Sequence, residues 1–363
     1  MHMCPSFEAL CCLRDDGSYI FLGFSLSAVL KKKRFNAVDV GHILIFVHKM
    51  TRMSPNTQTA AKTPRDQIIQ SSCPACGAMV GGETIEVHDH EYGLSHIAKY
   101  LECGVCSTLF QEPMPTLAEL SAFYPSDYHS MTHAGLLNKI RNDVRIRRLS
   151  KLVIDEGVIL DYGCGDGAFM VQAAQRLPQR HFWGFEIADR TETTILAEGK
   201  VTLVKGSLRD LLAILPSCGL ITLNHVIEHL PDPLSVVTAL ADRLLPGGIF
   251  EGQTPASDSL ERSVFGRKWS GYHAPRHTVI FSRAGLCCML ERSGLSMPSV
   301  LGAFNPAALA VSLGSVPRNG VGRIRRSGLK WFVLVALAGG LAPIDLWSRR
   351  PGIINFIAFK LPS

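Results

Sequence analysis

The stretch VILDYGCGDGAFM, Val158 to Met170, decides the fold. Its first half is an apolar run of the kind that forms a buried strand, and its second half alternates glycine with small or acidic residues. Because glycine has no Cβ, a loop built on Gly163 and Gly165 lets backbone N–H groups approach a ligand directly. The stretch therefore predicts a strand, then a ligand-binding loop, then a helix over 167–177.

Strands and helices continue to alternate after this loop. Strands are predicted over 181–187 and 219–226, and a helix over 233–245 carries apolar residues at 234, 237, 240, 241 and 244, all on one face. Alternating units at this spacing predict an α/β fold of the Rossmann-like, doubly wound kind, with a mostly parallel sheet covered by helices on both faces.

An acid at the end of the second strand completes a nucleotide site. Glu186 lies 186 − 165 = 21 residues after Gly165, about the distance at which an acid accepts hydrogen bonds from ribose hydroxyls. A dinucleotide loop would read G-x-G-x-x-G, but this loop reads G-x-G-x-G, with Asp161 before it and Asp166 inside it. These carboxylates would repel a pyrophosphate and suit a ligand with an ammonium and a sulfonium. The pattern favours S-adenosylmethionine over NAD, and a Rossmann-type nucleotide-cofactor oxidoreductase is the alternative.

The same stretch resembles the first motif of class I S-adenosylmethionine-dependent methyltransferases. The resemblance continues through GFEIAD, LITLNHVIEHLPDP, RLLPGGIFEGQTP and WSGYHAPRHTVIFSRAGL, the last of which is similar to bacterial methyltransferases with an N-terminal zinc ribbon. It implies O-, N- or C-methylation of a small-molecule or glycan-type acceptor. A non-catalytic binding protein that retains the fold is a second alternative, because Cys218-Gly219 stands where such enzymes usually carry Phe-Asp.

The resemblance also implies which residues hold the methyl donor. It assigns Gly163 and Gly165 to the methionine part and Glu186 to the ribose hydroxyls. It places Ser207, where an acid is usual, near the adenine edge, and Asn224 at the end of the fourth strand. The full predicted set is Asp161, Gly163, Gly165, Glu186, Ile187, Ser207 and Asn224.

Candidate bases cluster after the fourth strand and in a later loop. Methyl transfer depends on alignment of nucleophile, methyl and leaving sulfur, and a hydroxyl or acidic-carbon acceptor must also lose a proton. The candidates are His225, Glu228, His229, His273 and His277. His225 and His273 are predicted as catalytic, Glu228 and His229 as a packing pair, and His277 as either a site residue or a structural strand start. Arg276 suits a carboxylate or phosphate on the substrate.

Two C-x₂-C pairs predict a structural zinc site. The pairs are Cys73/Cys76 and Cys103/Cys106, and together they supply four thiolates with no open coordination position. The intervening 26 residues, 77–102, exceed the usual ribbon spacing of about 15–20. An empty or degenerate ribbon is the alternative.

Composition limits the partners and the compartment. The 363 residues are 47% hydrophobic, and 37 Lys and Arg against 31 Asp and Glu give a net charge of +6, which does not suggest a nucleic-acid partner. The basic cluster Arg141–Arg148 is interpreted as a solvated face. Eleven cysteines, an odd number with adjacent pairs, are not typical of a disulfide framework, so a cytoplasmic location is predicted.

Five segments are predicted along the chain. They are an extension and linker over 1–60, a zinc-ribbon-like module over 70–115, a helical connector over 116–157, the methyltransferase domain over 158–300 and an apolar region over 301–363. We hypothesise that the working protein starts at Met53. The uncharged run 331–344 is shorter than the ~20 residues that span a bilayer. It predicts peripheral membrane contact through 318–360, a lid over a hydrophobic or lipid-linked acceptor, or an apolar segment packed on the sheet.

Overall fold

The computed structural model describes residues 70–124, 136–152, 154, 156–316, 324 and 328–362. The chain divides into two units, Met1–Gln67 and Ile68–Ser363. The first unit lies outside the described residues, and so do the predicted extension and the hypothesised start at Met53. The fold described below is that of the second unit.

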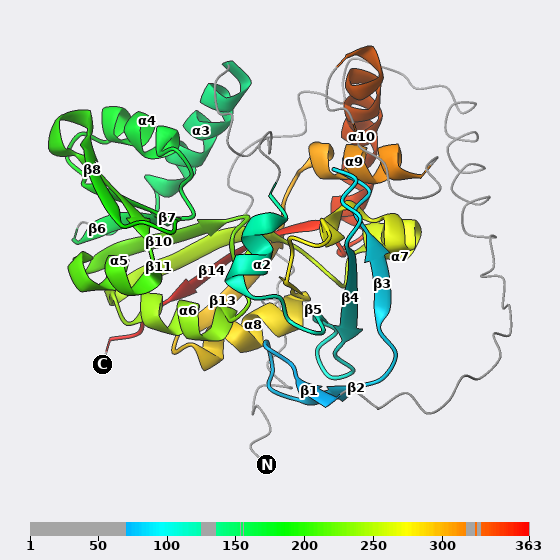
Figure 1. Ribbon diagram of the computed structural model, residues 1–363. Coiled ribbons are helices and arrows are strands. Elements are labelled where there is room, and N and C mark those ends of the chain that lie inside the picture. Colours follow the sequence, from blue (N-terminus) through cyan, green and yellow to red (C-terminus); the bar gives the residue numbers. More distant parts are fainter. Residues whose placement is uncertain are drawn as a thin grey trace, which may run out of the picture. The chain divides into compact units, whose positions relative to one another are not determined.

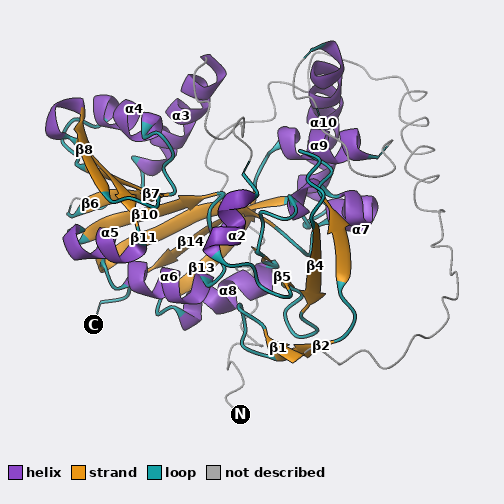
Figure 2. Cartoon of the chain, in the orientation of Figure 1, coloured by secondary structure: helices purple, strands orange, loops and turns teal. Residues whose placement is uncertain are grey.

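An eight-stranded sheet forms the centre of this unit, with the order β13-β14-β11-β10-β6-β7-β9-β8 (Figures 1 and 2). Adjacent parallel strands make up its middle: β11 (Leu244–Pro255), β10 (Cys218–Asn224), β6 (Val158–Tyr162), β7 (Phe182–Ile187) and β9 (Val201–Gly206). Antiparallel strands extend both edges: β8 (Glu192–Leu196), β14 (Ile353–Phe359) and β13 (Ser296–Gly302). The predicted α/β, mostly parallel fold is confirmed.

Helices cover both faces of the sheet. The α-helices are α2 (Leu117–Ala122), α3 (Leu136–Leu149), α4 (Ala168–Arg176), α5 (Leu208–Ile214), α6 (Pro233–Ala241), α7 (Leu260–Phe265), α8 (Arg283–Arg292), α9 (Pro306–Ser315) and α10 (Leu329–Trp347). Short 3₁₀ helices are η3 (Ala197–Gly199), η4 (Ile227–His229), η5 (Gly266–Lys268) and η6 (Ser270–Tyr272). Figure 1 shows α3 and α4 on one side of the sheet and α5, α6 and α8 on the other.

Alternation along β6 explains this two-sided cover. Successive side chains of a strand point to opposite faces. Ile159 accordingly packs with Leu149 of α3 and Met170 of α4, whereas Leu160 packs with Leu211 of α5 and the residues of α6 and α8. Because both faces are buried, β6 does not alternate between apolar and polar residues, and its one charged residue, Asp161, is buried as well.

The order of strands reverses at β6. From β6 the chain proceeds to β7 and β9 on one side and then crosses to β10 and β11 on the other. Ligands of open parallel sheets bind beyond the carboxyl ends of the strands at such a reversal. The glycine loop follows β6, Glu186 ends β7 and Asn224 ends β10. The topology therefore places these predicted residues at one edge of the sheet.

The cysteine module is joined to the methyltransferase fold by a shared sheet. It contains β1 (Gln70–Ser72), β2 (Met79–Gly81), β3 (Ile85–His88), β4 (Ile97–Glu102) and β5 (Leu109–Gln111), and the order β12-β5-β4-β3 brings in β12 (Val279–Ile280). Strands β2, β3 and β4 occupy the long spacing between the two cysteine pairs. The module therefore does not form its sheet from its own residues alone.

The C-terminal region also contributes to the central sheet. Strand β14 pairs with β11 on one side and β13 on the other, so the boundary predicted at residue 300 runs through the sheet. None of the described helices is long and apolar enough to cross a membrane. Because β14 is built into the core, membrane contact within the described part of 318–360 would fall on α10, whose Trp347 is 87% exposed. That contact stays a prediction.

The place of β14 is testable at Gly252 of β11. A Cβ built on Gly252 would lie 2.2 Å from the Leu223 carbonyl oxygen and 2.4 Å from Cζ of Phe356 on β14. We expect Gly252→Ala to lower the free energy of unfolding by about 1–3 kcal/mol, as overpacking does, measured by urea denaturation. The control is Gly339→Ala in α10, where nothing lies within 4 Å and helix propensity predicts a neutral or slightly stabilising effect. Equal stability of the two variants would contradict this packing.

Candidate functional site

The glycine loop after β6 is a tight, left-handed turn. Gly163, Gly165 and Gly167 have φ values of +78°, +61° and +79°, a region that residues with a Cβ rarely adopt. A Cβ on Gly163 would also lie 2.4 Å from Cγ2 of Val226. The alternating glycines are therefore required both by the backbone conformation and by the close approach of the segment after β10.

Glu186 ties this loop to β7. Its Oε2 accepts a hydrogen bond of 2.7 Å from the Gly165 N–H, and the N–H groups of Gly163 and Cys164 donate to the Phe185 carbonyl at 2.8 and 3.0 Å. Burial raises the pKa of Glu186, and the hydrogen bond from Gly165 opposes that rise. Ile187, the next residue, is 55% exposed and adds an apolar surface beside the carboxylate.

A buried polar network lies at the end of β6 and β10. Arg145 of α3 donates from Nη2 to Asp161 Oδ1 at 2.7 Å and to Thr222 Oγ1 at 3.0 Å. Thr222 in turn donates to Glu251 Oε1 at 2.5 Å, and Asn224 Nδ2 donates to Thr222 Oγ1 at 2.5 Å. Two predicted cofactor residues, Asp161 and Asn224, are thus held by partners in this network.

Arg145 was missed by the sequence analysis. Its guanidinium lies 3.7 Å from the centroid of the Phe169 ring and pairs with the buried Asp161, so the interpretation of Arg141–Arg148 as a solvated face is wrong for Arg145. Burial raises the pKa of Asp161, and Arg145 opposes the rise. Arg148, three residues on, reaches Glu251 Oε2 at 3.3 Å. The i, i+3 spacing of the two arginines on one helix face is the signal that could have found them.

Ser207 lies at the predicted edge of the sheet, but its hydroxyl is hydrogen-bonded to Asp210. It follows β9 and caps α5, accepting from the Asp210 N–H at 3.3 Å and donating to Asp210 Oδ2 at 2.7 Å. The Ser207 backbone N–H also donates to that carboxylate at 3.0 Å. The side chain is therefore part of a capping box, and Asp210 brings a carboxylate close to the position where an acid is usual.

His225 lies directly after β10, at the carboxyl edge of the sheet. Its φ is +56°, and its side chain is 42% exposed. Its Nε2 lies 2.8 Å from Gln253 Oε1, and its Nδ1 lies 3.4 Å from Glu228 Oε1. Glu228 is fully buried. Burial raises its pKa, but the hydrogen bond and charge of His225 outweigh burial and lower it overall.

His273, the other predicted catalytic residue, has both ring nitrogens occupied. Nδ1 lies 2.7 Å from Glu91 Oε2, and Nε2 accepts from Arg276 Nε at 3.0 Å. Arg276 is itself completely buried and donates to Asp89 Oδ2 at 3.1 Å. The expectation that Arg276 faces a substrate anion is wrong, because its charge is neutralised inside the protein.

The four predicted zinc ligands come together. The sulfur atoms of Cys73, Cys76, Cys103 and Cys106 all lie within 4.8 Å of one another, and two of the pairs are 3.7 and 3.6 Å apart. A tetrahedral ion with Zn–S bonds of about 2.3 Å requires sulfur atoms roughly 3.8 Å apart. The pKa of Cys106 is lowered, to about 5, chiefly because the Cys73 thiol donates to it.

Both cysteine pairs have the same backbone geometry. Gly77 N–H donates to the Cys73 carbonyl at 2.8 Å, and Ser107 N–H donates to the Cys103 carbonyl at 2.7 Å. Gly77 and Ser107 both have positive φ, +78° and +60°. Each pair is thus a knuckle that turns its two thiols to one side, and the donor set fits a structural zinc ion.

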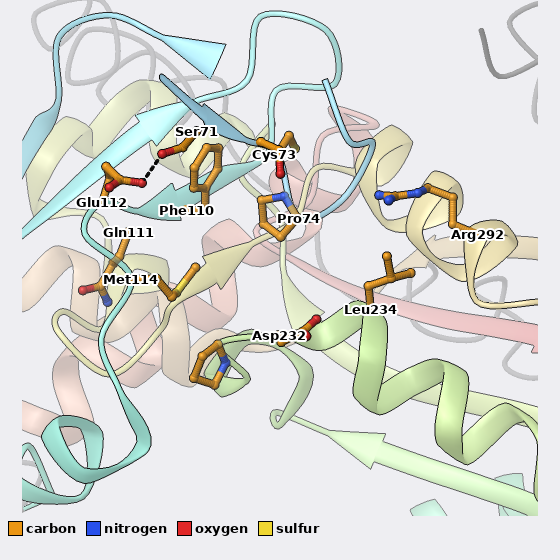
Figure 3. A pocket seen from close by; sticks show the side chains of 12 residues that line it. Ser71, Cys73, Pro74, Phe110, Gln111, Glu112, Met114, Asp232, Leu234 and Arg292 are labelled. Carbon is orange, nitrogen blue, oxygen red and sulfur yellow. Dashed lines mark hydrogen bonds between the residues drawn. The ribbon is translucent and has the colours of Figure 1, made fainter. Parts of the chain in front are cut away.

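A cavity of about 300 Å³ lies where the cysteine module meets the start of α6 (Figure 3). Cys73, Phe110 and Glu112 line it from the module, Leu234 from α6 and Arg292 from α8. None of the predicted cofactor residues lines it. The cavity therefore belongs to the contact between the module and the central fold and is separate from the glycine loop.

The chain has known relatives. Residues 139–300 match a family described as a methyltransferase domain. Over 169 residues the chain is 30% identical to a ubiquinone biosynthesis O-methyltransferase of Nitrosospira multiformis, a match that covers 43% of this chain and 70% of that protein. The chain belongs to the class I S-adenosylmethionine-dependent methyltransferases. The predicted enzyme class is confirmed, and the oxidoreductase alternative is set aside.

Solved methyltransferases resemble this one at low identity. A SAM-dependent methyltransferase from Archaeoglobus fulgidus is 17% identical, with a TM-score of 0.39, and the match covers 61% of this chain and 94% of that one. Phosphoethanolamine N-methyltransferase 2 of Haemonchus contortus, in complex with S-adenosyl-L-methionine, is 14% identical, with a TM-score of 0.40, and the match covers 61% of this chain and 53% of that one.

The cysteine cluster of this methyltransferase predicts a measurable metal dependence. We expect Cys103→Ser to lose the zinc ion and to lower the melting temperature, because knuckle 103–106 packs on the start of α8: Cys106 Sγ lies beside Gly285, and the Ser282 hydroxyl donates to the Cys106 carbonyl. Zinc content by mass spectrometry and thermal unfolding are the two measurements. Cys287→Ser, which changes a thiol outside the cluster, is the control and should keep its zinc. A Cys103→Ser protein with unchanged zinc and stability would contradict the structural zinc site.

Proposed function

We propose that this methyltransferase transfers the methyl group of S-adenosylmethionine to a hydroxyl of a small-molecule or glycan-type acceptor. The observation that carries the proposal is the glycine loop, tied by Gly165 to Glu186 at the reversal point of the sheet. Oxygen as the accepting atom is supported by the name of the Nitrosospira multiformis relative, an O-methyltransferase. N- or C-methylation is the alternative outcome.

The donor site we propose uses residues from four strand ends. The N–H groups of the glycine loop would face the methionine part, and Glu186 would accept from the ribose hydroxyls while the exposed Ile187 packs against the adenine. Ser207 and Asn224 would border the ligand, and Asp161 would hold the loop through Arg145. When bound, S-adenosylmethionine supplies an electrophilic methyl carbon, so the residues that hold it orient the methyl group toward the acceptor and exclude water.

His225 is the residue we propose as the base. It is 42% exposed at the same edge of the sheet, and its Nε2 would exchange Gln253 Oε1, now 2.8 Å away, for the acceptor hydroxyl and take its proton. Glu228 Oε1, 3.4 Å from Nδ1, would stabilise the imidazolium that forms. His273 would be a positioning residue, because its side chain is only 10% exposed and its two nitrogens hold the buried Glu91 and Arg276. The zinc ion at the cysteine cluster would stabilise the fold and take no part in the transfer.

The proposal predicts where a labelled methyl group goes. Incubation of the full chain with methyl-labelled S-adenosylmethionine and a deproteinised cell extract should move label into the small-molecule fraction. His225→Asn should slow this transfer by about 10²–10⁴-fold, the usual contribution of a general base, with unchanged affinity for the donor. The control is His181→Asn, which changes an exposed histidine before β7.

Each failure has its own meaning. Label that enters only added macromolecules would contradict the acceptor class. An intact protein that binds S-adenosylmethionine but transfers no label to any fraction would favour the non-catalytic alternative. Full activity of His225→Asn would show that another group takes the proton.

A further inference from the structure

Three side chains outside the glycine loop and the cysteine cluster converge at the carboxyl edge of the sheet. Glu228 and His229 lie in η4, directly after β10, and His277 lies just before β12. One donor atom of each lies within 4.8 Å of those of the other two. The two segments are held together because Thr278 donates to the Glu228 carbonyl through its N–H at 2.7 Å and its hydroxyl at 3.1 Å.

The hydrogen bonds around these residues fix which atoms carry lone pairs. His277 Nδ1 lies 2.8 Å from the Gly271 carbonyl oxygen and His229 Nδ1 lies 3.1 Å from the Arg276 carbonyl oxygen. His229 Nδ1 also lies 3.0 Å from the Tyr124 hydroxyl, which can accept from it as well. Because a carbonyl oxygen only accepts, we assign the proton to each Nδ1 and a lone pair to each Nε2. His277 Nε2 lies 3.9 Å from Glu228 Oε1.

Glu228 supplies an independent observation. Its side chain is fully buried, and its Oε1 makes no close hydrogen bond among the described residues, since His225 Nδ1 lies 3.4 Å away. The other oxygen, Oε2, accepts from Thr254 Oγ1 at 3.0 Å. A fully buried carboxylate with so long a contact at one oxygen is unfavourable unless a cation compensates its charge. Here it faces the lone pair of His277 Nε2.

We propose that Glu228, His229 and His277 bind a divalent first-row transition-metal ion such as Zn²⁺, at a site distinct from the four cysteines. The surrounding hydrogen bonds have the form that metal ligands require: each imidazole donates its other N–H to a backbone carbonyl, and the carboxylate accepts from Thr254. Two imidazoles and one carboxylate favour such an ion over Mg²⁺ or Ca²⁺, which prefer oxygen ligands.

The ion would act on the acceptor, and this role rests on the function proposed above. Three protein ligands leave a coordination position open, as in catalytic metal sites. His225, whose Nδ1 lies 3.4 Å from Glu228 Oε1, stands beside the ion. An acceptor hydroxyl bound at the open position would lose its proton more readily, and His225 would receive that proton.

Metal content of the full chain tests the site without any activity assay. After loading with Zn²⁺ and removal of free metal, the wild-type protein should hold two zinc ions per chain, one for each cluster of ligands. His277→Asn and Glu228→Gln should each hold one, as should Cys103→Ser, whereas the exposed-site control His181→Asn should hold two. A wild-type protein with one ion, lost in Cys103→Ser and kept in His277→Asn, would overturn the proposal.

A measurement on the unaltered protein covers the case in which these variants do not fold. Loaded with Co²⁺, the wild-type chain should give two exchangeable, hyperfine-shifted imidazole N–H signals in its proton NMR spectrum, from His229 and His277. The four-cysteine site contains no imidazole and gives none. A Co²⁺-loaded protein without these signals would overturn the proposed metal site. Binding of S-adenosylmethionine is measured separately, so failure of the metal site can be told apart from failure of the proposed function.

Discussion

The N–H of Gly165 and the carboxylate of Glu186, 2.7 Å apart, join the two strands on which the rest of the site is arranged. For this contact to form, the loop after β6 must turn through three residues of positive φ and lie over the end of β7. Gly163 must also lack a Cβ, because a Cβ there would clash with Val226. The parallel pairing of β6 with β7 sets the position of the loop. Once it is set, the parallel pairing of β10 with β6 places Asn224 and His225 at the same carboxyl edge of the sheet.

Buried charges near this edge of the sheet and in the cysteine module occur in compensated pairs. Arg145 neutralises Asp161 beneath the loop, and Arg276 neutralises Asp89 where the cysteine module meets the loop before β12. Removing one member of such a pair leaves an uncompensated buried charge, so these pairs constrain how α3 and the module can dock. Glu228 differs from these pairs, because its Oε1 faces His225 Nδ1 at 3.4 Å and makes no closer hydrogen bond among the described residues. The proposed metal ion would compensate the charge of this carboxylate.

Local patterns made the centre of the site predictable. The strand–loop–helix order, the acid at Glu186 and the two cysteine pairs each depend on residues close together in the sequence, and the structure brings each set together. Long-range pairing was not predictable. The run GIINFIAF is equally apolar as an interfacial segment and as a buried strand, so nothing local reveals that β14 inserts between β11 and β13.

The chemistry of polar side chains was predicted less well than their positions. Arg145, Arg276 and His273 were each interpreted from residue type, but their roles depend on partners that the chain supplies from distant segments: Asp161, Asp89 and Glu91. The same holds for His229 and His277, whose free lone pairs follow from the backbone carbonyls that their Nδ1 atoms contact. The residue type limits which interactions a side chain can make, and the neighbouring side chain or carbonyl determines which of them it makes.

Calorimetric titration of S-adenosylmethionine into the full chain tests the central claim most directly. The test variant is Glu186→Ala. Its matched control is Glu192→Ala, which removes an exposed acid on β8. Hydrogen bonds to a charged group contribute about 1.5–3 kcal/mol, so Glu186→Ala should raise the dissociation constant roughly 10- to 100-fold, while Glu192→Ala binds like the wild type and NAD does not bind. Equal affinity of the two variants, or tight binding of NAD, would contradict the assignment of the glycine loop and Glu186 to the methyl donor.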